Sequence, residues 1–296
     1  MMRSSTFAGN DHGDARSVGF GGRGSKEEND NQKALLIIHP RKDRVCRFLG
    51  REFLMQILVV DVGGTHVKIL ATGQQAPRKF VSGSSLTAEQ MVSRVIKAAK
   101  GWKYEAVSIG YPGPLLRGKP IAEPHNLGPG WVGFDFEAAF GCPVKLINDA
   151  AMQALGSYEG GKMLFLGLGT GLGSAMIVDG MVEPMELGHL PYRKGTYEDY
   201  LGLRGWKRVG KKKWRHYIDD VVARLIAALE PDYVVLGGGN VHKLTELPPR
   251  CRMGDNANAF RGGFRLWEAT GKGRVSLPAS SPRPLKDKQA SEVKRT

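Results

Sequence analysis

The chain has 296 residues, which is enough for one large or two small domains with a real hydrophobic core. Its 43 Lys and Arg against 29 Asp and Glu give a formal net charge of +14. No apolar run reaches the roughly 18 residues of a membrane span, and the first residues lack the apolar core of a secretory signal. The three cysteines are too widely spaced for a disulfide framework or a metal site. We therefore expect a cytoplasmic protein with no membrane partner.

The two ends of the chain differ in composition from the rest. Residues 1–54 are rich in Gly, Ser, Asn, Asp and charge without periodicity, whereas Met55 leads directly into an apolar run. We expect residues 1–54 to be a disordered or spurious extension and residues 271–296 to be a disordered basic tail. The expected lobes of the core are 55–157 with a return helix at 257–270, and 158–256.

In chain order, the first half of the core predicts three short strands, a helix, a strand, and then a further strand and helix. Apolar residues run continuously or alternate in the strands and recur every three or four positions in the helices. The expected strands are 57–61, 67–71, 79–81, 106–109 and 144–147, and the expected helices are 87–99 and 148–155.

The second half repeats this order. The expected strands are 163–166, 174–178, 181–184 and 233–236, and the expected helices are 217–229 and 257–267. Asp179-Gly180 predicts a tight hairpin turn between two of these strands. Three strands, a helix and a strand, found twice, predict a duplicated α/β fold with a cleft between its halves.

A Gly/Thr turn follows the first strand of each half. The first turn holds Gly63, Gly64 and Thr65, and the second turn holds Gly169, Thr170 and Gly171. Backbone N–H groups in such turns can approach phosphate oxygens closely, because glycine has no Cβ in the way. Either turn alone is typical of an ordinary hairpin, but the pair predicts that one phosphorylated ligand is held from both sides.

One segment of the core is strongly basic. The range 204–215 contains Arg204, Lys207, Arg208, Lys211, Lys212, Lys213 and Arg215, and it contains no acidic residue. Such a run indicates a local anionic partner rather than a general affinity for nucleic acid. A solvated helix face or turn explains it equally well.

Six short motifs occur in an order that matches a known family. They are 60–65 (VDVGGT), 110–114 (GYPGP), 148–150 (NDA), 166–174 (LGLGTGLGS), 186–189 (ELGH) and 236–239 (LGGG). The chain resembles the ROK group of sugar kinases, in the superfamily of actin, hexokinase and the heat-shock chaperone ATPases, and within it the polyphosphate-type glucokinases. The resemblance implies a duplicated actin-like (ribonuclease-H-like) α/β fold with two lobes and a central cleft. It also implies phosphorylation of a sugar.

Phosphoryl transfer requires a held donor, a metal ion that neutralises charge, and an acceptor hydroxyl in line. The two Gly/Thr turns would hold the donor phosphates, and Lys68 would either reach these phosphates or face solvent. Asp61, beside the first turn, would hold Mg²⁺ directly or through a water, or else cap the turn. Asp149 starts a helix, where aspartate is a normal cap, and by resemblance it is the base for the sugar 6-hydroxyl. By resemblance, Gly237-Gly238-Gly239 holds adenosine.

The resemblance also implies the residues that recognise the sugar. They are Asn126, Asn148, Glu186, His189 and, as a weaker candidate, Glu198. Family members follow the Gly-His pair with a cysteine cluster that binds a structural zinc, but here no cysteine follows until Cys251. A zinc site needs about four close ligands, so we expect no zinc.

Several alternatives stay open at this stage. The donor is polyphosphate, ATP or both, and the acceptor is glucose or another hexose such as mannose, fructose or an N-acetylhexosamine. A non-catalytic sugar sensor is a further alternative, although residues 1–54 show no pair of DNA-binding helices. Association into a homodimer is also open.

Overall fold

The computed structural model describes residues 46–48, 51–53 and 55–268. These residues belong to one of the two units of the chain, His39–Thr296, and the other unit, Met1–Ile38, lies outside the described residues. The expectations for the tail at 271–296 and for most of 1–54 lie outside them as well. An antiparallel pair that the sequence did not predict, β1 (Cys46–Phe48) with β2 (Arg51–Phe53), precedes the core. Within the described residues, no helix is both long and apolar enough to cross a membrane.

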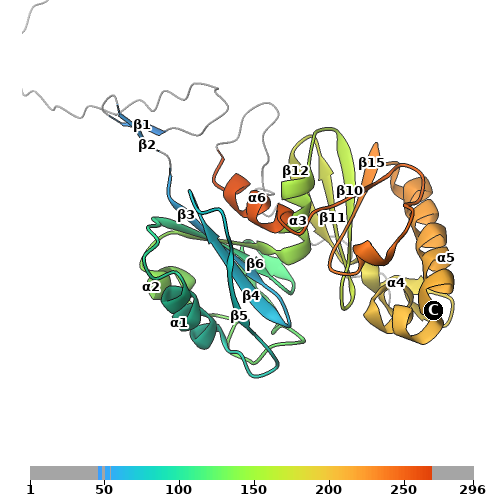
Figure 1. The fold of residues 1–296 in the computed structure, drawn as a ribbon, viewed down its shortest axis with the longest axis horizontal. Helices are drawn as coiled ribbons and strands as arrows, with labels where there is room; N and C mark the ends of the chain where they lie inside the picture. Colours follow the sequence, from blue (N-terminus) through green and yellow to red (C-terminus); the bar gives the residue numbers. More distant parts are fainter. Residues whose placement is uncertain (1–45, 49–50, 54, 269–296) are drawn as a thin grey trace, which may run out of the picture. The chain divides into compact units, whose positions relative to one another are not determined.

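The first sheet has five strands in the order β5-β4-β3-β6-β9 (Figure 1). Its elements are β3 Ile57–Val62, β4 His66–Ala71, β5 Arg78–Val81, α1 Ala88–Ala98, β6 Ala106–Tyr111, α2 Phe136–Phe140 and β9 Val144–Asn148. Strands β3, β4 and β5 form an antiparallel meander, and β6 and β9 extend the sheet in parallel from β3. Every residue of β6 is buried, as expected of a central strand covered on both faces.

The second sheet repeats this topology in the order β12-β11-β10-β15-β16. Its elements are β10 Lys162–Leu168, β11 Leu172–Val178, β12 Met181–Met185, α5 Leu203–Leu229, β15 Tyr233–Gly237 and β16 Cys251–Met253. Again three strands form an antiparallel meander; β15 pairs in parallel with β10, and β16 pairs in parallel with β15. The predicted duplication within an α/β fold is therefore confirmed.

The remaining elements are short or join the sheets. They are β7 Leu115–Leu116, β8 Lys119–Pro120, α3 Asp149–Ser157, η1 Leu187–His189, β13 Pro191–Tyr192, β14 Gly195–Thr196, α4 Tyr197–Leu201, η2 Val241–Lys243 and α6 Asn258–Arg265. The closing helix α6 is shorter than the expected 257–270, whose last two residues lie outside the described part. The lobe boundaries themselves stay a prediction.

Local chemistry explains where several of these helices begin. Thr87 forms a capping box with Gln90 at the start of α1, and the Asn148 side chain accepts the Ala151 N–H at the start of α3. The hairpin between β11 and β12 turns at Asp179 and Gly180, which both have positive φ, as a two-residue hairpin turn requires. The sequence predicted each of these positions.

Helices α3 and α6 join the two sheets. Helix α3 follows β9 of the first sheet yet also packs against β10, β11 and β12, whereas α6 follows β16 of the second sheet yet packs against β3 and β6. A shared apolar cluster fills the space around them, and it includes Val59, Ile147, Phe165, Ala175 and Phe260. The two halves of the fold are therefore held by one common core.

The contact between α3 and α6 depends on glycine. A Cβ built on Gly156 would overlap the Asn258 carbonyl oxygen, and one built on Gly262 would overlap the Met152 carbonyl oxygen. Hydrogen bonds seal the same contact: Asn258 Nδ2 donates to Ser157 Oγ at 2.9 Å, and Arg265 donates to the Leu155 carbonyl oxygen at 2.7 Å. The two helix backbones therefore lie closer than any side chain allows.

Helix α5 differs from the expected 217–229. It begins at Leu203, so the whole basic segment 204–215 is helical, and its lysines and arginines are exposed except for half-buried Arg215. Gly210, with φ 73° and ψ 170°, breaks the regular geometry and divides the helix into two pieces. Trp214 and Tyr217 anchor the second piece in the core of the second sheet.

We expect Gly262→Ala to destabilise the fold. Alanine gains about 1 kcal/mol of helix propensity over glycine, but overlap with the Met152 backbone forces the helices apart, which typically costs about 1–3 kcal/mol and more against backbone. The melting temperature should therefore fall, while Ser93→Ala on the exposed face of α1 should leave it within about 1 °C. An unchanged or raised melting temperature for Gly262→Ala would contradict the close helix contact.

Candidate functional site

Two aspartates meet at the carboxyl ends of the parallel strands of the first sheet. Asp61 lies in β3 opposite Gly110 of β6, and Gly110 lies opposite Ile147 of β9, after which Asn148 and Asp149 start α3. A Cβ built on Gly110 would overlap the end of the Met152 side chain and would stand in ordinary contact, 3.6 Å, with the Asp149 Cα. The missing side chain of Gly110 thus leaves room for Met152 of α3 against β6.

The electrostatics of this pair are unusual. Burial, together with the nearby negative charges of Asp61 and Glu186, raises the pKa of Asp149 to about 7, against a hydrogen bond from the Ala150 N–H at 2.7 Å that lowers it. Burial also raises the pKa of Asp61, and Lys68 opposes that rise. Aspartates with raised pKa values in such a place are typical of acid–base sites.

Lys68 forms an ion pair with Asp61. The two residues face each other across β3 and β4, and Lys68 Nζ lies 3.5 Å from Asp61 Oδ2. The Asp61 side chain is 14% exposed and that of Lys68 is 40% exposed. The Lys68 ammonium is therefore partly exposed but points towards the site, where it offsets the negative charge of the more buried Asp61 carboxylate.

The first Gly/Thr turn is held by its own backbone and by one serine. Gly63 N–H donates to the His66 carbonyl oxygen at 3.0 Å, and Ser82 Oγ donates to the Gly63 carbonyl oxygen at 2.6 Å. Gly64 and Thr65 are exposed at its tip. Their N–H groups can therefore be reached by a ligand that lies over the turn.

The second Gly/Thr turn is fixed by contacts from two other segments. Leu203 N–H, at the start of α5, lies 3.1 Å from the carbonyl oxygens of both Gly169 and Thr170. Asn240 Nδ2 donates to the Gly169 carbonyl oxygen at 2.8 Å. Thr170 is exposed and Gly171 is half-buried. The carbonyl oxygens of this turn are thus bound on one side, which leaves the hydroxyl of Thr170 open.

The Gly237-Gly238-Gly239 turn lies against the second Gly/Thr turn. Gly238 has φ 80°, and a Cβ on it would stand 2.7 Å from the Leu168 backbone. Asn240 N–H donates to the Leu168 carbonyl oxygen at 2.9 Å. Gly239 is exposed with nothing close to its Cβ position. The predicted nucleotide turn and the predicted phosphate turn are therefore neighbours.

The structure places the expected sugar-binding residues in two groups. Asn126 is exposed and lies against the first turn, where its Cβ is 3.1 Å from a Cβ built on Gly64. Asn148 is committed to structure: its oxygen caps α3 and its amide donates to the Gly113 carbonyl oxygen at 3.3 Å. Because the oxygen and the nitrogen of its amide are both engaged, Asn148 is better placed to hold the loop at Gly113 than to bind a ligand.

The second group is on the short elements η1 and α4. Glu186 and His189 are exposed at the two ends of η1, and the charge of Glu186 acts on Asp149. Glu198, on α4, lies beside the second turn: its Oε2 is 2.5 Å from a Cβ built on Gly171, and its own Cβ is 3.5 Å from one built on Gly188. The three carboxylates of Asp149, Glu186 and Glu198 therefore come from three different elements, α3, the start of η1 and α4.

Some residues of the site carry no local sequence signal. Asn240 and Ser82 bind the two turns and Arg204 pairs with Glu198 beside the second turn, and each meets its partner only through the fold. In the part of the chain that the structure describes, no three His, Cys, Asp or Glu side chains gather into a metal-binding group. The absence of zinc stays a prediction.

Comparison with known proteins gives a family match and distant relatives. The model described as the ROK family matches residues 57–194. The polyphosphate glucokinase of Mycobacterium tuberculosis (strain CDC 1551 / Oshkosh) is 26% identical over 216 residues, covering 64% of this chain and 80% of that protein. The bifunctional enzyme NanE/NanK of Brucella melitensis is 22% identical (62% and 45% covered). The kanosamine kinase of Amycolatopsis mediterranei is 27% identical (50% and 56% covered).

Solved structures share the fold. An inorganic polyphosphate/ATP-glucomannokinase from Arthrobacter sp. strain KM matches with a TM-score of 0.59 and 21% identity, covering 71% of this chain and 97% of that one. A ROK family glucokinase from Streptomyces griseus matches with a TM-score of 0.57 and 18% identity, covering 71% and 98%. At these identities the likeness shows the fold alone, and it confirms the predicted actin-like α/β class.

We expect Asp149→Asn to stabilise the chain at pH 8. The folded-state pKa of about 7 lies above the value of 3.8 for a free aspartate, so the folded state holds its proton more tightly, and stability falls as the pH rises towards 7. Asparagine removes this loss, and the melting temperature should rise by at least about 2 °C, the shift that 1 kcal/mol produces in a domain of this size. At pH 4.5 the gain should vanish.

Thermal unfolding of both chains across pH 4.5–8 measures this difference. Asp179→Asn, in the hairpin between β11 and β12, is the matched control, since asparagine also adopts positive φ. A pH-independent effect of Asp149→Asn, or a loss of stability at pH 8, would contradict the raised pKa.

Proposed function

We propose that this chain, which carries a ROK family domain over residues 57–194, is a hexose kinase that phosphorylates the 6-hydroxyl of glucose. The proposed donor is polyphosphate, ATP or both. The observation that carries the proposal is the placement of Asp149, with its raised pKa, near Asp61 at the carboxyl ends of the parallel strands β3 and β9. The named relatives, which include a polyphosphate glucokinase, support the same reaction class.

In the proposed reaction Asp149 acts as the general base. Its carboxylate takes the proton of the sugar 6-hydroxyl as the oxygen bonds to the terminal phosphorus of the donor, and the bond from that phosphorus to the leaving oxygen breaks. A pKa near the working pH suits this role, because the group is both substantially ionised and basic enough to accept a proton. The hydrogen bond from Ala150 fixes one carboxylate oxygen.

Asp61 fits a magnesium ion that arrives with the donor. A carboxylate is the hard oxygen ligand that Mg²⁺ prefers, and one protein carboxylate with phosphate oxygens and waters is a common set for this ion. When bound there, the ion neutralises charge on the transferring phosphate. The Lys68 ammonium, 3.5 Å from Asp61, can turn towards the same phosphates once the ion takes over its role.

The two Gly/Thr turns would hold the donor. Gly63, Gly64 and Thr65 would offer N–H groups from the first sheet, and Gly169, Thr170 and Gly171 from the second. Leu203 and Asn240 bind the carbonyl oxygens of the second turn. Gly239, exposed beside it, would let the flat surface of an adenosine approach the backbone.

The exposed cations of α5 favour a long polyanion as a donor. An open groove of about 590 Å³ lies on this helix, and it is lined by Val209, Lys212, Lys213, Arg215, His216 and Asp219. Lys212 lies in the second piece of α5, beyond the break at Gly210, whereas Leu203 at the second turn begins the first piece. Phosphates that continue past the reacting end of a polyphosphate chain would meet these side chains, whereas those of ATP would end earlier.

Fewer observations bear on the identity of the sugar acceptor than on the phosphoryl donor. Asn126, Glu186, His189 and Glu198 would bind sugar hydroxyls, and unpaired polar groups would reject the wrong sugar. Relatives named NanE/NanK and kanosamine kinase make another hexose, an N-acetylhexosamine included, the second candidate acceptor. A non-catalytic sugar sensor is the alternative of another class, and the raised pKa of Asp149 argues against it because a sensor needs no base.

Asp149→Asn should abolish most of the activity of the full chain with glucose and Mg²⁺. Removal of a general base typically lowers turnover by about 10²–10⁴-fold, and asparagine cannot accept the hydroxyl proton. Formation of sugar phosphate in a coupled assay measures the effect, with Asp179→Asn as the control that should keep full activity. Retention of more than a few per cent of the activity by Asp149→Asn would overturn the assignment.

A panel of donors and hexoses tests the proposal as a whole. With long-chain polyphosphate, the KM should rise steeply with salt, since a polyanion displaces counterions when it binds. Replacing Lys212 and Lys213 by glutamine should raise the KM for polyphosphate several-fold and leave the KM for ATP unchanged, and Lys97→Gln on α1 should change neither. Equal effects on both donors would refute the proposal that polyphosphate binds along α5. No product from any pair of donor and hexose would refute the kinase.

A further inference from the structure

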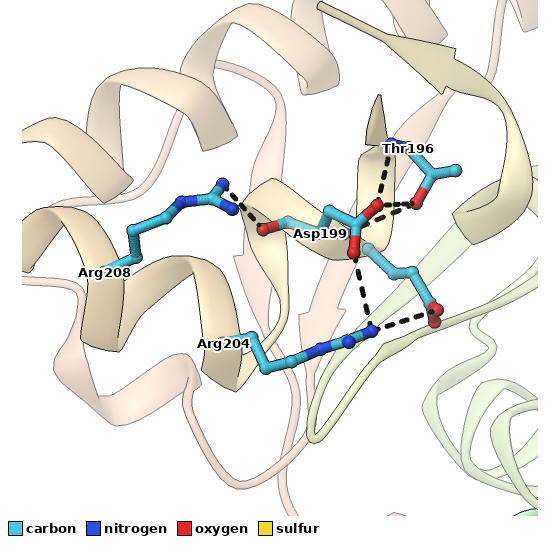
Figure 2. A network of polar contacts seen from close by, with 5 residues as sticks. Thr196, Asp199, Arg204 and Arg208 are labelled. Atoms are coloured by element: carbon cyan, nitrogen blue, oxygen red, sulfur yellow. Dashed lines mark hydrogen bonds and ion pairs between the residues drawn. The ribbon is translucent and has the colours of Figure 1, made fainter. Parts of the chain in front are cut away.

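Arg204 follows Leu203, which binds the second Gly/Thr turn, and it pairs with two carboxylates of α4. It is in the first turn of α5, and its guanidinium lies 3.4 Å from Asp199 Oδ1 and 3.9 Å from Glu198 Oε1 (Figure 2). The Arg204 side chain is 76% exposed. A guanidinium has five N–H donors, so most of those on Arg204 are available for a further partner.

The two carboxylates hold Arg204 unequally. Asp199 is fixed: its Oδ2 accepts from the Thr196 N–H at 3.0 Å and from the Thr196 hydroxyl at 2.9 Å (Figure 2). Arg208 donates to the Asp199 carbonyl oxygen at 3.0 Å. The bonds from Thr196, with the charge of Arg204, hold the pKa of Asp199 below its usual value. The longer contact to Glu198 is therefore the one that can break.

Glu198 is shared between this network and the proposed sugar and donor sites. Its other oxygen, Oε2, lies against Gly171 of the second turn. The residue before Arg204, Leu203, donates its N–H towards the Gly169 and Thr170 carbonyl oxygens of that turn. The guanidinium of Arg204 and the turn that would hold the donor phosphates therefore face the same carboxylate from two sides.

We propose that Arg204 couples the donor site to the sugar site. Without a donor it is bound to Glu198; when donor phosphates occupy the second turn, it turns to them and releases Glu198 to the sugar. Asp199 keeps the arginine in place during this exchange. The inference rests on the proposed function, and it assigns Arg204 a role in the order and cooperativity of substrate binding.

Charge and geometry favour the exchange in this direction. A terminal phosphate carries more charge than a carboxylate, and guanidinium binds two phosphate oxygens at once, whereas the contact to Glu198 is a single one at 3.9 Å. An exposed ion pair of this kind is weak. We therefore expect a modest coupling, about two- to fivefold in sugar affinity, and by linkage the same factor in donor affinity.

The test measures binding rather than turnover. The probe sugar is 6-deoxyglucose, which has no 6-hydroxyl to phosphorylate, and its Kd for the full chain is measured by calorimetry with Mg²⁺, first alone and then with saturating tripolyphosphate or ATP. Wild type should bind the sugar about two- to fivefold more tightly with a donor present. Arg204→Gln should show a ratio near one and a weaker Kd for the donor.

Arg208→Gln is the matched control. It removes another arginine of the same network and helix, but one that contacts the Asp199 backbone and not Glu198, so its ratio should equal that of wild type. If Arg204→Gln does not fold, Glu198→Gln removes the same pair from the other side and should also bring the ratio to one.

The outcomes separate this inference from the proposed function. Sugar and donor that both bind wild type without mutual effect, or an unchanged ratio in Arg204→Gln, would overturn the coupling alone. A wild-type chain that phosphorylates no hexose and binds neither ligand would overturn the proposed function, and the coupling with it.

Discussion

The carboxyl of Asp149 is largely shielded from water and feels the negative charge of Asp61, and the other features of the site depend on this unfavourable interaction. Burial and the negative charge of Asp61 both oppose ionisation of Asp149. Asp149 is held in this position at the start of α3, which packs closely against β6 because Gly110 has no side chain. Among the described residues, Lys68 is the cation that pairs with Asp61. A bound cation, or a proton on Asp149, would therefore reduce the repulsion between the two aspartates.

The duplicated fold contains two similar turns, but different segments of the chain bind them. The first turn is closed by its own sheet through Ser82, whereas the second is bound by Leu203 of α5 and Asn240 beyond β15. Helix α1 of the first half is short, and its counterpart α5 carries the dense positive charge of the chain. The two halves therefore share a topology but differ in what binds their turns and in the charge of their helices.

Local patterns predicted most of the strands and both turns, because these depend on alternation, burial and glycine. They also predicted the junction at Asn148 and Asp149, since a cap followed by an apolar helix is a local signal. They placed the start of this helix at 217 and left the basic run open between a helix face and a turn, whereas α5 begins at Leu203 and Trp214 packs into the core. The bond from Asn240 to Gly169 spans 71 residues, so no local signal could indicate it.

The central claim is that the Asp149 carboxyl titrates near neutrality because of its place in the fold. Carbon-13 NMR of the full chain with labelled aspartate measures this directly, with Asp149→Asn to assign the signal. The account predicts a midpoint at about pH 7 in the ligand-free chain, which falls when Asp61→Asn removes the neighbouring charge. A midpoint near 4, unaffected by Asp61→Asn, would contradict it.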